Sequence, residues 1–229
     1  DWMNQSVFIQ KFDSTGTALG TQIQLNGASS SDNSSPQIVS VGNAGEYIVT
    51  WSGDGDIYVQ KFNADGTTTG NSAVILEGVA GTADEQPQIT TLSDGSYVVT
   101  WFGADTDGEN SVFVQKFNSN GTTQGTQVKL ERAGVTNEND ERPQVTALDN
   151  GEFAVTWEAV SLDWSTFSIV VQKFDSTGAT QGASVELSGL GGMTDAPQIT
   201  TLATGEYVVT YSSTSSDWMN QSVFVQKFD

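Results

Sequence analysis

A short apolar phrase recurs five times along the chain, and this repeat limits the possible folds more than any other feature. Its consensus is Val-Phe-Val-Gln-Lys-Phe-Asp. The copies begin at Val7, Ile57, Val112, Ile169 and Val223, and are therefore 50, 55, 57 and 54 residues apart. Self-similarity at a period of this order is typical of solenoids, propellers and repeat arrays. The fold must be a series of similar units.

Each repeat contains four short segments with the pattern of β-strands. In the second repeat they are 87–92, 96–101, 111–117 and 126–130, and apolar residues alternate within them. No segment of the chain has a sustained helical period. Two other phrases mark the same repeats: a Pro-Gln pair (Pro36, Pro87, Pro143, Pro197) and a Val-Thr-Trp type ending (Trp51, Trp101, Trp157, Tyr211).

Four-stranded units of this length favour β-propeller blades, which repeat small antiparallel sheets around an axis. A β-solenoid usually has shorter coils, and separate sandwiches would each bury little core. We therefore predict an all-β fold, a β-propeller with four-stranded antiparallel blades and the Pro-Gln strands innermost.

The chain begins and ends with nearly the same thirteen residues. Residues 1–13 recur at 217–229, and only Ile9 is replaced, by Val225. The match includes the loop residues, which differ between the other repeats, so we infer a recent duplication of four repeats at once. This predicts a closed four-bladed propeller, a single domain over 1–229 that is one unit of a longer tandem array. Residues 197–211 and 21–25 would contribute to the last blade, leaving one copy of its third strand surplus.

The strand phrases resemble a known class of proteins. The run Gln-Lys-Phe-Asp-Ser-Thr-Gly, followed by Pro-Gln-Ile and Gly-Glu-Tyr-Val-Val-Thr, is similar to tandem repeats of large secreted bacterial proteins of the RTX, or haemolysin-type calcium-binding, class. The resemblance implies a calcium-rich extracellular or cell-surface location, an adhesive role, and neighbouring copies of the domain. The Gly-Asp nonapeptide of RTX β-rolls is absent, so that calcium site is not carried over.

Composition excludes several functions. There are 28 acidic and 8 basic residues, for a net charge of −20. Nucleic-acid binding needs a basic surface, so this charge excludes it. The chain has no cysteine and no histidine, which removes thiol and imidazole catalysis. No apolar run approaches the roughly 20 residues that span a bilayer, so we expect no membrane insertion.

Acidic residues in the longer loops are candidate calcium ligands. In an antiparallel blade the loops between strands two and three, and between blades, share one face. Carboxylates two residues apart in such loops can direct several oxygens at one hard cation, although acidic loops also serve simply as a solvated surface. The predicted metal ligands are Asp54, Asp56, Asp84, Asp105, Asp107, Glu109, Asp140 and Asp195.

An Asp-Trp pair precedes the third strand in three places. The pairs are Asp1-Trp2, Asp163-Trp164 and Asp217-Trp218. An indole face with a nearby carboxylate suits a sugar, which needs an apolar ring to stack on and an acceptor for its hydroxyls. The alternative is that these rings fold back and fill the blade margin, as most large aromatic residues do.

Two polar series follow the repeat. The glutamines Gln37, Gln88, Gln144 and Gln198 could surround a central channel, or bond to neighbouring backbone. The lysines Lys11, Lys61, Lys116, Lys173 and Lys227 could line a groove, or lay their stems over the sheet near its edge.

The sequence therefore predicts a non-catalytic module, not an enzyme. It would bind a glycan or a cell surface through the acidic loops, with calcium. One alternative is a spacer in an adhesin. Another is a carboxylate-based glycan hydrolase, but acid pairs are so numerous in this chain that no catalytic dyad stands out.

Overall fold

The computed structural model describes residues 5–26, 32–42, 44–69, 72–79, 82–132, 135 and 138–229. In these residues the regular structure is β-strand, apart from one 3-10 turn at Asp149–Gly151. None of the described segments forms a helix with the length and apolar character needed to cross a bilayer.

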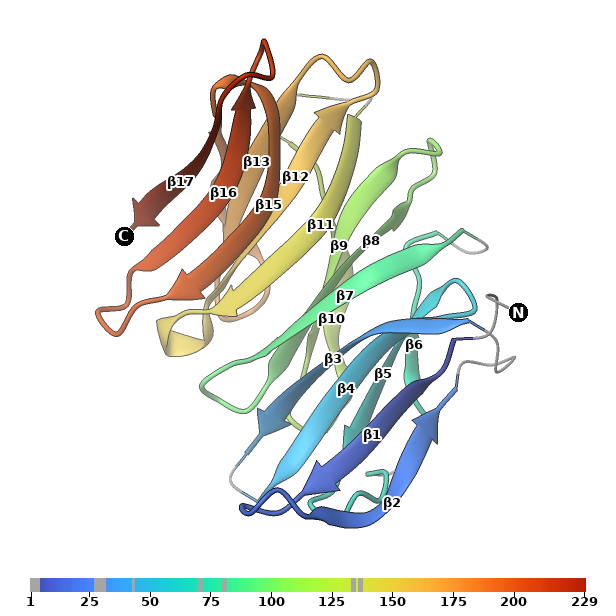
Figure 1. The fold of residues 1–229 in the computed structure, drawn as a ribbon. Helices are drawn as coiled ribbons and strands as arrows, with labels where there is room; N and C mark the ends of the chain where they lie inside the picture. Colours follow the sequence, from blue (N-terminus) through green and yellow to red (C-terminus); the bar gives the residue numbers. More distant parts are fainter. Residues whose placement is uncertain are drawn as a thin grey trace.

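The strands form five antiparallel sheets that follow one another along the chain (Figure 1). The first sheet contains β1 (Val7–Phe12) and β2 (Ala18–Leu25). Three four-stranded sheets follow. The first contains β3 (Asn33–Val41), β4 (Glu46–Gly53), β5 (Asp56–Phe62) and β6 (Val74–Leu76), and the second contains β7 (Asp84–Thr91), β8 (Tyr97–Ala104), β9 (Asn110–Phe117) and β10 (Thr123–Leu130). The third contains β11 (Glu138–Ala147), β12 (Phe153–Ser161), β13 (Phe167–Phe174) and β14 (Thr180–Leu187). The last sheet contains β15 (Gly191–Thr201), β16 (Tyr207–Ser215) and β17 (Gln221–Phe228). The predicted all-β fold of four-stranded antiparallel blades is confirmed. We number the blades one to four, starting from β3, β7, β11 and β15.

The Pro-Gln strands contact each other from blade to blade. β3 packs beside β7, β7 beside β11, and β11 beside β15. The two-stranded sheet β1–β2 and the three-stranded sheet β15–β17 lie at opposite ends of this series (Figure 1). In the described residues no strand pairing joins these two sheets, and no closed ring is formed.

The duplicated strand has a partner at each end of the chain. β1 pairs with β2, so that Val7 lies opposite Leu25. β17 pairs with β16, so that Tyr211 lies opposite Phe224. We expected residues 21–25 to complete the last blade. They pair with β1 across a tight hairpin, but this hairpin does not pair with β15–β17, and in the described residues the last blade has three strands.

A bulge before each proline explains how proline fits in these strands. Ser35, Gln86, Arg142 and Ala196 precede the four prolines and have φ between 50 and 52°. The pairing register shifts at the same points. Proline has no N–H for a ladder hydrogen bond, and a bulge removes the need for one.

Each blade also has a stacked aromatic pair across its two middle strands. The ring centroids are 5.1 Å apart for Tyr47 and Phe62, and 4.6 Å apart for Phe153 and Phe174. Apolar side chains from both sides of each blade-to-blade junction make one buried cluster. The core therefore lies between blades, and each blade depends on its neighbours.

Candidate active site

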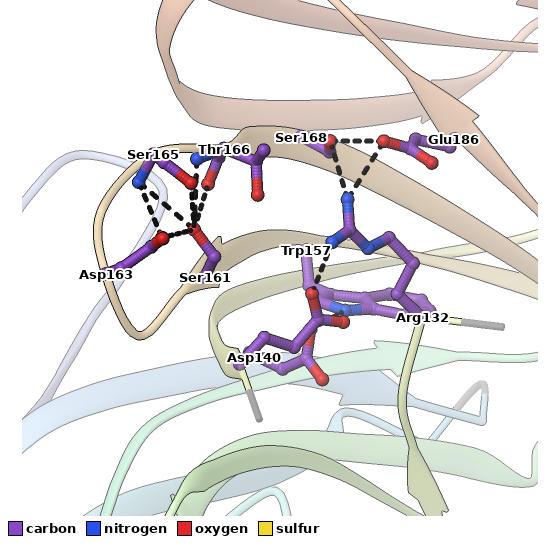
Figure 2. Close-up of polar contacts among 10 residues, drawn as sticks. Arg132, Asp140, Trp157, Ser161, Asp163, Ser165, Thr166, Ser168 and Glu186 are labelled. Atoms are coloured by element: carbon purple, nitrogen blue, oxygen red, sulfur yellow. Dashed lines mark hydrogen bonds and ion pairs between the residues drawn. The ribbon is translucent and has the colours of Figure 1, made fainter. Parts of the chain in front are cut away.

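Two buried carboxyl groups lie beneath tryptophans in the two middle blades. The indole Nε1–H of Trp157 donates to Asp140 Oδ1 at 2.7 Å, and that of Trp101 donates to Asp84 Oδ1 at 3.2 Å (Asp140 in Figure 2). Each carboxyl stands three residues before the proline, on the first strand of its blade. The repeat alone places them there, because strands one and two pair in the same register in both blades.

Burial makes these two carboxyls unusual acids. Desolvation, together with the nearby Glu138 carboxylate, raises the pKa of Asp140 to about 8, although the Trp157 hydrogen bond and the Arg132 charge act in the opposite direction. Desolvation likewise raises the pKa of Asp84 to about 7. A buried carboxyl without a cationic partner keeps its proton, because the charged form is poorly solvated. Asp140 can therefore donate a proton near neutral pH.

Asp140 lines a small acidic cleft between blades two and three. The cleft has a volume of about 90 Å³. Its walls come from the β8–β9 loop, the start of β9 and the connection from β10 to β11. The lining residues are Asp105, Asp107, Glu109, Ser111, Glu131, Val135, Glu138 and Asp140. This volume admits a few waters or the reacting atoms of a substrate, but is well below the roughly 300 Å³ of a site that encloses a small molecule.

Asp105 lines the same cleft, but its surroundings lower its pKa, whereas those of Asp140 raise it. Burial would raise its pKa, but hydrogen bonds from Lys129, Ser111 and two backbone N–H groups outweigh burial and lower the pKa to about 2. Lys129 Nζ is 2.6 Å from Asp105 Oδ2, and the Ser111 hydroxyl donates to the same oxygen at 2.9 Å. Between about pH 2 and pH 8, Asp105 is therefore ionised while Asp140 is protonated.

Arg132 does not line the cleft but pairs with Glu138, which does. Its guanidinium lies 2.8 Å from Glu138 Oε2 and 3.0 Å from Glu186 Oε1 (Glu186 in Figure 2). It also donates to the Ser168 hydroxyl at 3.1 Å. Burial raises the pKa of Glu138, and Arg132 opposes this rise. Arg132 therefore links three strands of blade three, β11, β13 and β14.

A further buried carboxyl group, that of Glu158, was not identified from the sequence. Glu158, next to Trp157 on β12, accepts from the Arg142 guanidinium at 3.1 Å and from the Ala196 N–H at 2.7 Å. Burial raises its pKa. Arg142 and Ala196 occupy equivalent bulges in blades three and four. The only sequence signal was an acid where the other repeats have Ser52, Phe102 and Ser212.

The structure separates the predicted metal ligands into different places. Asp105, Asp107, Glu109 and Asp140 share the acidic cleft. Asp54 and Asp56 flank the β4–β5 turn, Asp84 lies under Trp101, and Asp195 accepts from the Ser212 hydroxyl on β16. In the described part of the chain no three acidic side chains are arranged to hold a metal ion. Calcium binding stays a prediction.

The two described Asp-Trp pairs lie in exposed loops. Trp164 and Trp218 are 66% and 64% exposed, and neither fills a blade margin. Asp163 Oδ1 accepts from Ser161 Oγ at 2.7 Å and from the Ser165 N–H at 3.0 Å (Figure 2). Asp217 makes the equivalent turn contacts. The pair Asp1-Trp2 lies outside the described residues. Their role as ligand-binding residues stays a prediction.

The glutamine series lies on the four strands that run beside one another. Gln37, Gln88, Gln144 and Gln198 each follow a bulge on β3, β7, β11 and β15. Gln198 Nε2 donates to the Pro197 carbonyl at 2.8 Å, as the backbone-bonding alternative requires. A channel role for this series stays a prediction.

The lysine series joins blades. Lys11 Nζ donates to the Ala64 carbonyl at 2.6 Å, Lys61 to the Ser119 carbonyl at 3.0 Å, and Lys116 to the Ser176 carbonyl. In each case the acceptor lies in the strand three-to-four turn of the next blade. Lys173 and Lys227 have no such turn beyond them and pair with Glu152 and Glu206.

No protein-family model and no curated protein matches the chain. Solved structures of similar fold are glycan-acting enzymes. An α-L-arabinanase of Penicillium chrysogenum has 17% identity and a TM-score of 0.58, and the match covers 84% of this chain and 61% of the enzyme. A Hadza microbial sialidase has 11% identity and a TM-score of 0.57, with 85% and 44% covered. The family GH93 α-L-arabinofuranosidase of Fusarium graminearum has 14% identity and a TM-score of 0.55, with 85% and 62% covered.

At such low identity the likeness shows the fold alone, a β-propeller, and the chain spans less than two thirds of each of these three enzymes. It nevertheless corrects our prediction of a non-catalytic binding module that is not an enzyme. These neighbours contradict that prediction, because all three are glycan-acting enzymes, so we pursue the hydrolase alternative below. We had argued against catalysis because the chain has no histidine and no cysteine, but glycoside hydrolysis needs only two carboxyl groups.

Proposed function

We propose that the protein is a carboxylate-based glycan hydrolase whose site is the acidic cleft between blades two and three. The observation that carries the proposal is that two carboxyl groups lining one cleft have pKa values far apart. The pKa of Asp140 is about 8 and that of Asp105 is about 2. Two carboxyls whose environments separate their pKa values can divide the acid and carboxylate roles. The fold of the similar enzymes supports the same reaction class.

In this mechanism Asp140 is the general acid. It protonates the glycosidic oxygen as the bond to the sugar breaks, and the leaving group departs as a neutral alcohol. A water molecule forms the new bond to the anomeric carbon, and the proton that this water loses restores the acid form of the site. Trp157 holds the Asp140 carboxyl in place through its indole N–H, and burial keeps the proton on it until the substrate arrives. The proton comes from a group already uncharged at neutral pH, so no histidine is required.

Asp105 is the ionised partner. Positive charge develops at the sugar ring in the transition state, and a fixed negative charge in a partly enclosed site stabilises it. Lys129, Ser111 and the backbone of the β8–β9 loop hold Asp105 rigidly. The cleft admits only the reacting atoms, so the sugar rings would lie across the open face of the acidic loops.

The test is release of reducing ends from arabinan, galactan and a sialylated glycan. Asp140→Asn should lower the rate by roughly 10²–10⁴-fold, the usual worth of a general acid. Asp84→Asn is the matched control, because Asp84 has the same tryptophan bond but does not line the cleft. Activity should also fall as pH rises above about 8, where Asp140 loses its proton. Equal rates for the two variants, or no turnover of any substrate, would refute the proposal.

Three parts of the sequence-based reading remain proposals of their own: the RTX relationship, the extracellular or cell-surface location and calcium. Calcium can be tested alone. Ions that bind only the folded protein raise its melting temperature, so melting in millimolar calcium should exceed melting in sodium chloride of equal ionic strength. No difference would leave the acidic loops as a solvated surface.

A further inference from the structure

Strand β17 exposes an apolar stripe that is buried in the three inner copies of the phrase and mostly covered in the first. Val223 and Val225 of β17 are 75% and 67% exposed. The equivalent residues of β9, Val112 and Val114, are 0% and 3% exposed. The sequences are nearly the same, so the difference comes from what packs against each strand.

In the complete junctions a blade presents five apolar positions to the next blade. They come from the end of strand one, the start of strand two, two positions on strand three, and the end of strand four. The sets are Val41, Ile48, Ile57, Val59 and Leu76; Leu92, Val98, Val112, Val114 and Leu130; and Leu148, Ala154, Ile169, Val171 and Leu187. The third residue of each following Pro-Gln-x phrase (Ile89, Val145, Ile199) packs against its set.

Each end of the chain has part of such a set. Blade four has the first four positions, Leu202, Val208, Val223 and Val225, and no fourth strand pairs with it in the described residues. The sheet β1–β2 has strands three and four and lacks the first two positions. In blade one, Ile38 is the equivalent of Ile89, Val145 and Ile199, and the two missing positions would cover it. It is 61% exposed, whereas the other three residues are half-buried. The two ends are complementary halves of one junction.

The two halves of one chain do not meet. The sheets β1–β2 and β15–β17 lie at opposite ends of the series of blades (Figure 1). The three complete junctions repeat the same packing, which sets the rotation from blade to blade. Closing the ring within one chain would require all three tightly packed junctions to change, whereas a second copy can meet the free end without a change in any of these junctions.

We propose that the protein associates head to tail by strand exchange, with β17 of one copy replacing β1 in a second copy. β17 would pair with β2 of that copy in the register that β1 now has, Val223 opposite Leu25. The strands match at all but one of thirteen residues, so the exchanged pairing resembles the one lost. The gain is the rest of the junction, because β15 and β16 then cover Ile38 of the second copy. The proposal is independent of the catalytic one.

The two lysines without a blade-to-blade acceptor would obtain one. Lys227 of β17 would reach the Ala64 carbonyl of the second copy, as Lys11 now does within the chain. Lys173 would reach the turn that leads into β2 of the second copy, as Lys116 reaches Ser176. The contact is heterologous, so it extends into a chain of molecules or closes a larger ring. At −20 per copy, salt should strengthen it.

Cross-linking tests the exchanged register, and the chain has no cysteine of its own. Ile9 now lies opposite Ile23, so Val225, its equivalent, should lie opposite Ile23 of the second copy. A Val225→Cys protein mixed with an Ile23→Cys protein should give a disulfide-linked heterodimer on mild oxidation. Val185→Cys is the matched control. Val185 is the equivalent residue of β14, whose partner strand is in its own blade, and it should not cross-link to Val225→Cys.

The mass in solution is the second measurement. The wild type should exceed the monomer mass of 24.3 kDa at high protein concentration and more so in 1 M salt. Val223→Asp with Val225→Asp should stay monomeric with an unchanged circular dichroism spectrum, because both side chains are already exposed. A wild type that stays monomeric throughout would overturn the proposal. So would cross-links confined to single chains in the double variant with Ile23→Cys and Val225→Cys, which would show closure within one chain.

Discussion

The strand phrase of β9 and that of β17 are almost the same, yet one lies in the core and the other lies on the surface. On β9 the phrase is covered by β10 at its edge and by blade three on its face. On β17 it has β16 on one edge and no described strand on the other. The comparison teaches that a strand of this protein is buried only where a neighbouring blade packs against it.

The strongest test of this comparison is one charge placed at equivalent positions. Val112→Asp would bury an unpaired carboxylate and should lower the free energy of unfolding by about 4 kcal/mol or more. Val223→Asp should change it by less than about 0.5 kcal/mol, because the side chain is exposed. Urea denaturation of both variants at low protein concentration measures the difference. Similar losses would mean that β17 is buried in solution.

A second test compares the inner blades with the outer ones at the position beneath the strand-two aromatic residue. Blades two and three have Asp84 and Asp140 there, while blades one and four have Asn33 and Thr194, all of them buried. The pKa of Asp140 is raised in the folded protein, so the folded state holds a proton that the unfolded chain loses. Its contribution to stability is therefore greatest near pH 4 and is lost as pH rises towards about 8, by roughly 1.4 kcal/mol per pH unit.

Asp140→Asn should remove this dependence and raise the melting temperature more at pH 8 than at pH 5. The amide oxygen can still accept from Trp157, as the carboxyl does now. Asp84→Asn should likewise remove a pH dependence of stability, but one that ends near pH 7, the pKa of Asp84. Melting curves across pH measure both. Parallel curves for wild type and Asp140→Asn would show that this carboxyl is not held protonated.

The smallest effect concerns the lysines. Lys116→Met keeps the apolar stem and removes the bond to the Ser176 carbonyl of the next blade, so we expect a loss of about 1–2 kcal/mol. Lys227→Met should cause no measurable change in the free chain, because Lys227 is largely exposed and pairs only with Glu206 at the surface. Chemical denaturation of the two variants is sufficient. A cost for Lys227→Met that grows with protein concentration would instead support the strand exchange.

Much of the fold could be predicted because strand signals are local. Alternation within each phrase, the glycine-bearing turns and the proline positions are all written in neighbouring residues, and they predicted the four-stranded blades. The partner of residues 21–25 could not be predicted, because β1 and β17 are nearly the same strand and only geometry chooses between them. The site was predicted in part. Asp105, Asp107, Glu109 and Asp140 were predicted to be acids of one face and now line one cleft, although Asp140 lies on β11. Their role as calcium ligands stays a prediction.

The sequence by itself determined the repeat, the strands and their order, because these depend on side-chain alternation and on turns of a few residues. Tertiary structure decided which acids matter. Asp140 and Asp107 look alike in the sequence, but one is enclosed beneath an indole and the other is exposed to water. Only enclosure changes how tightly a carboxyl holds its proton, and enclosure results from two blades packing together, which no single stretch of the chain contains.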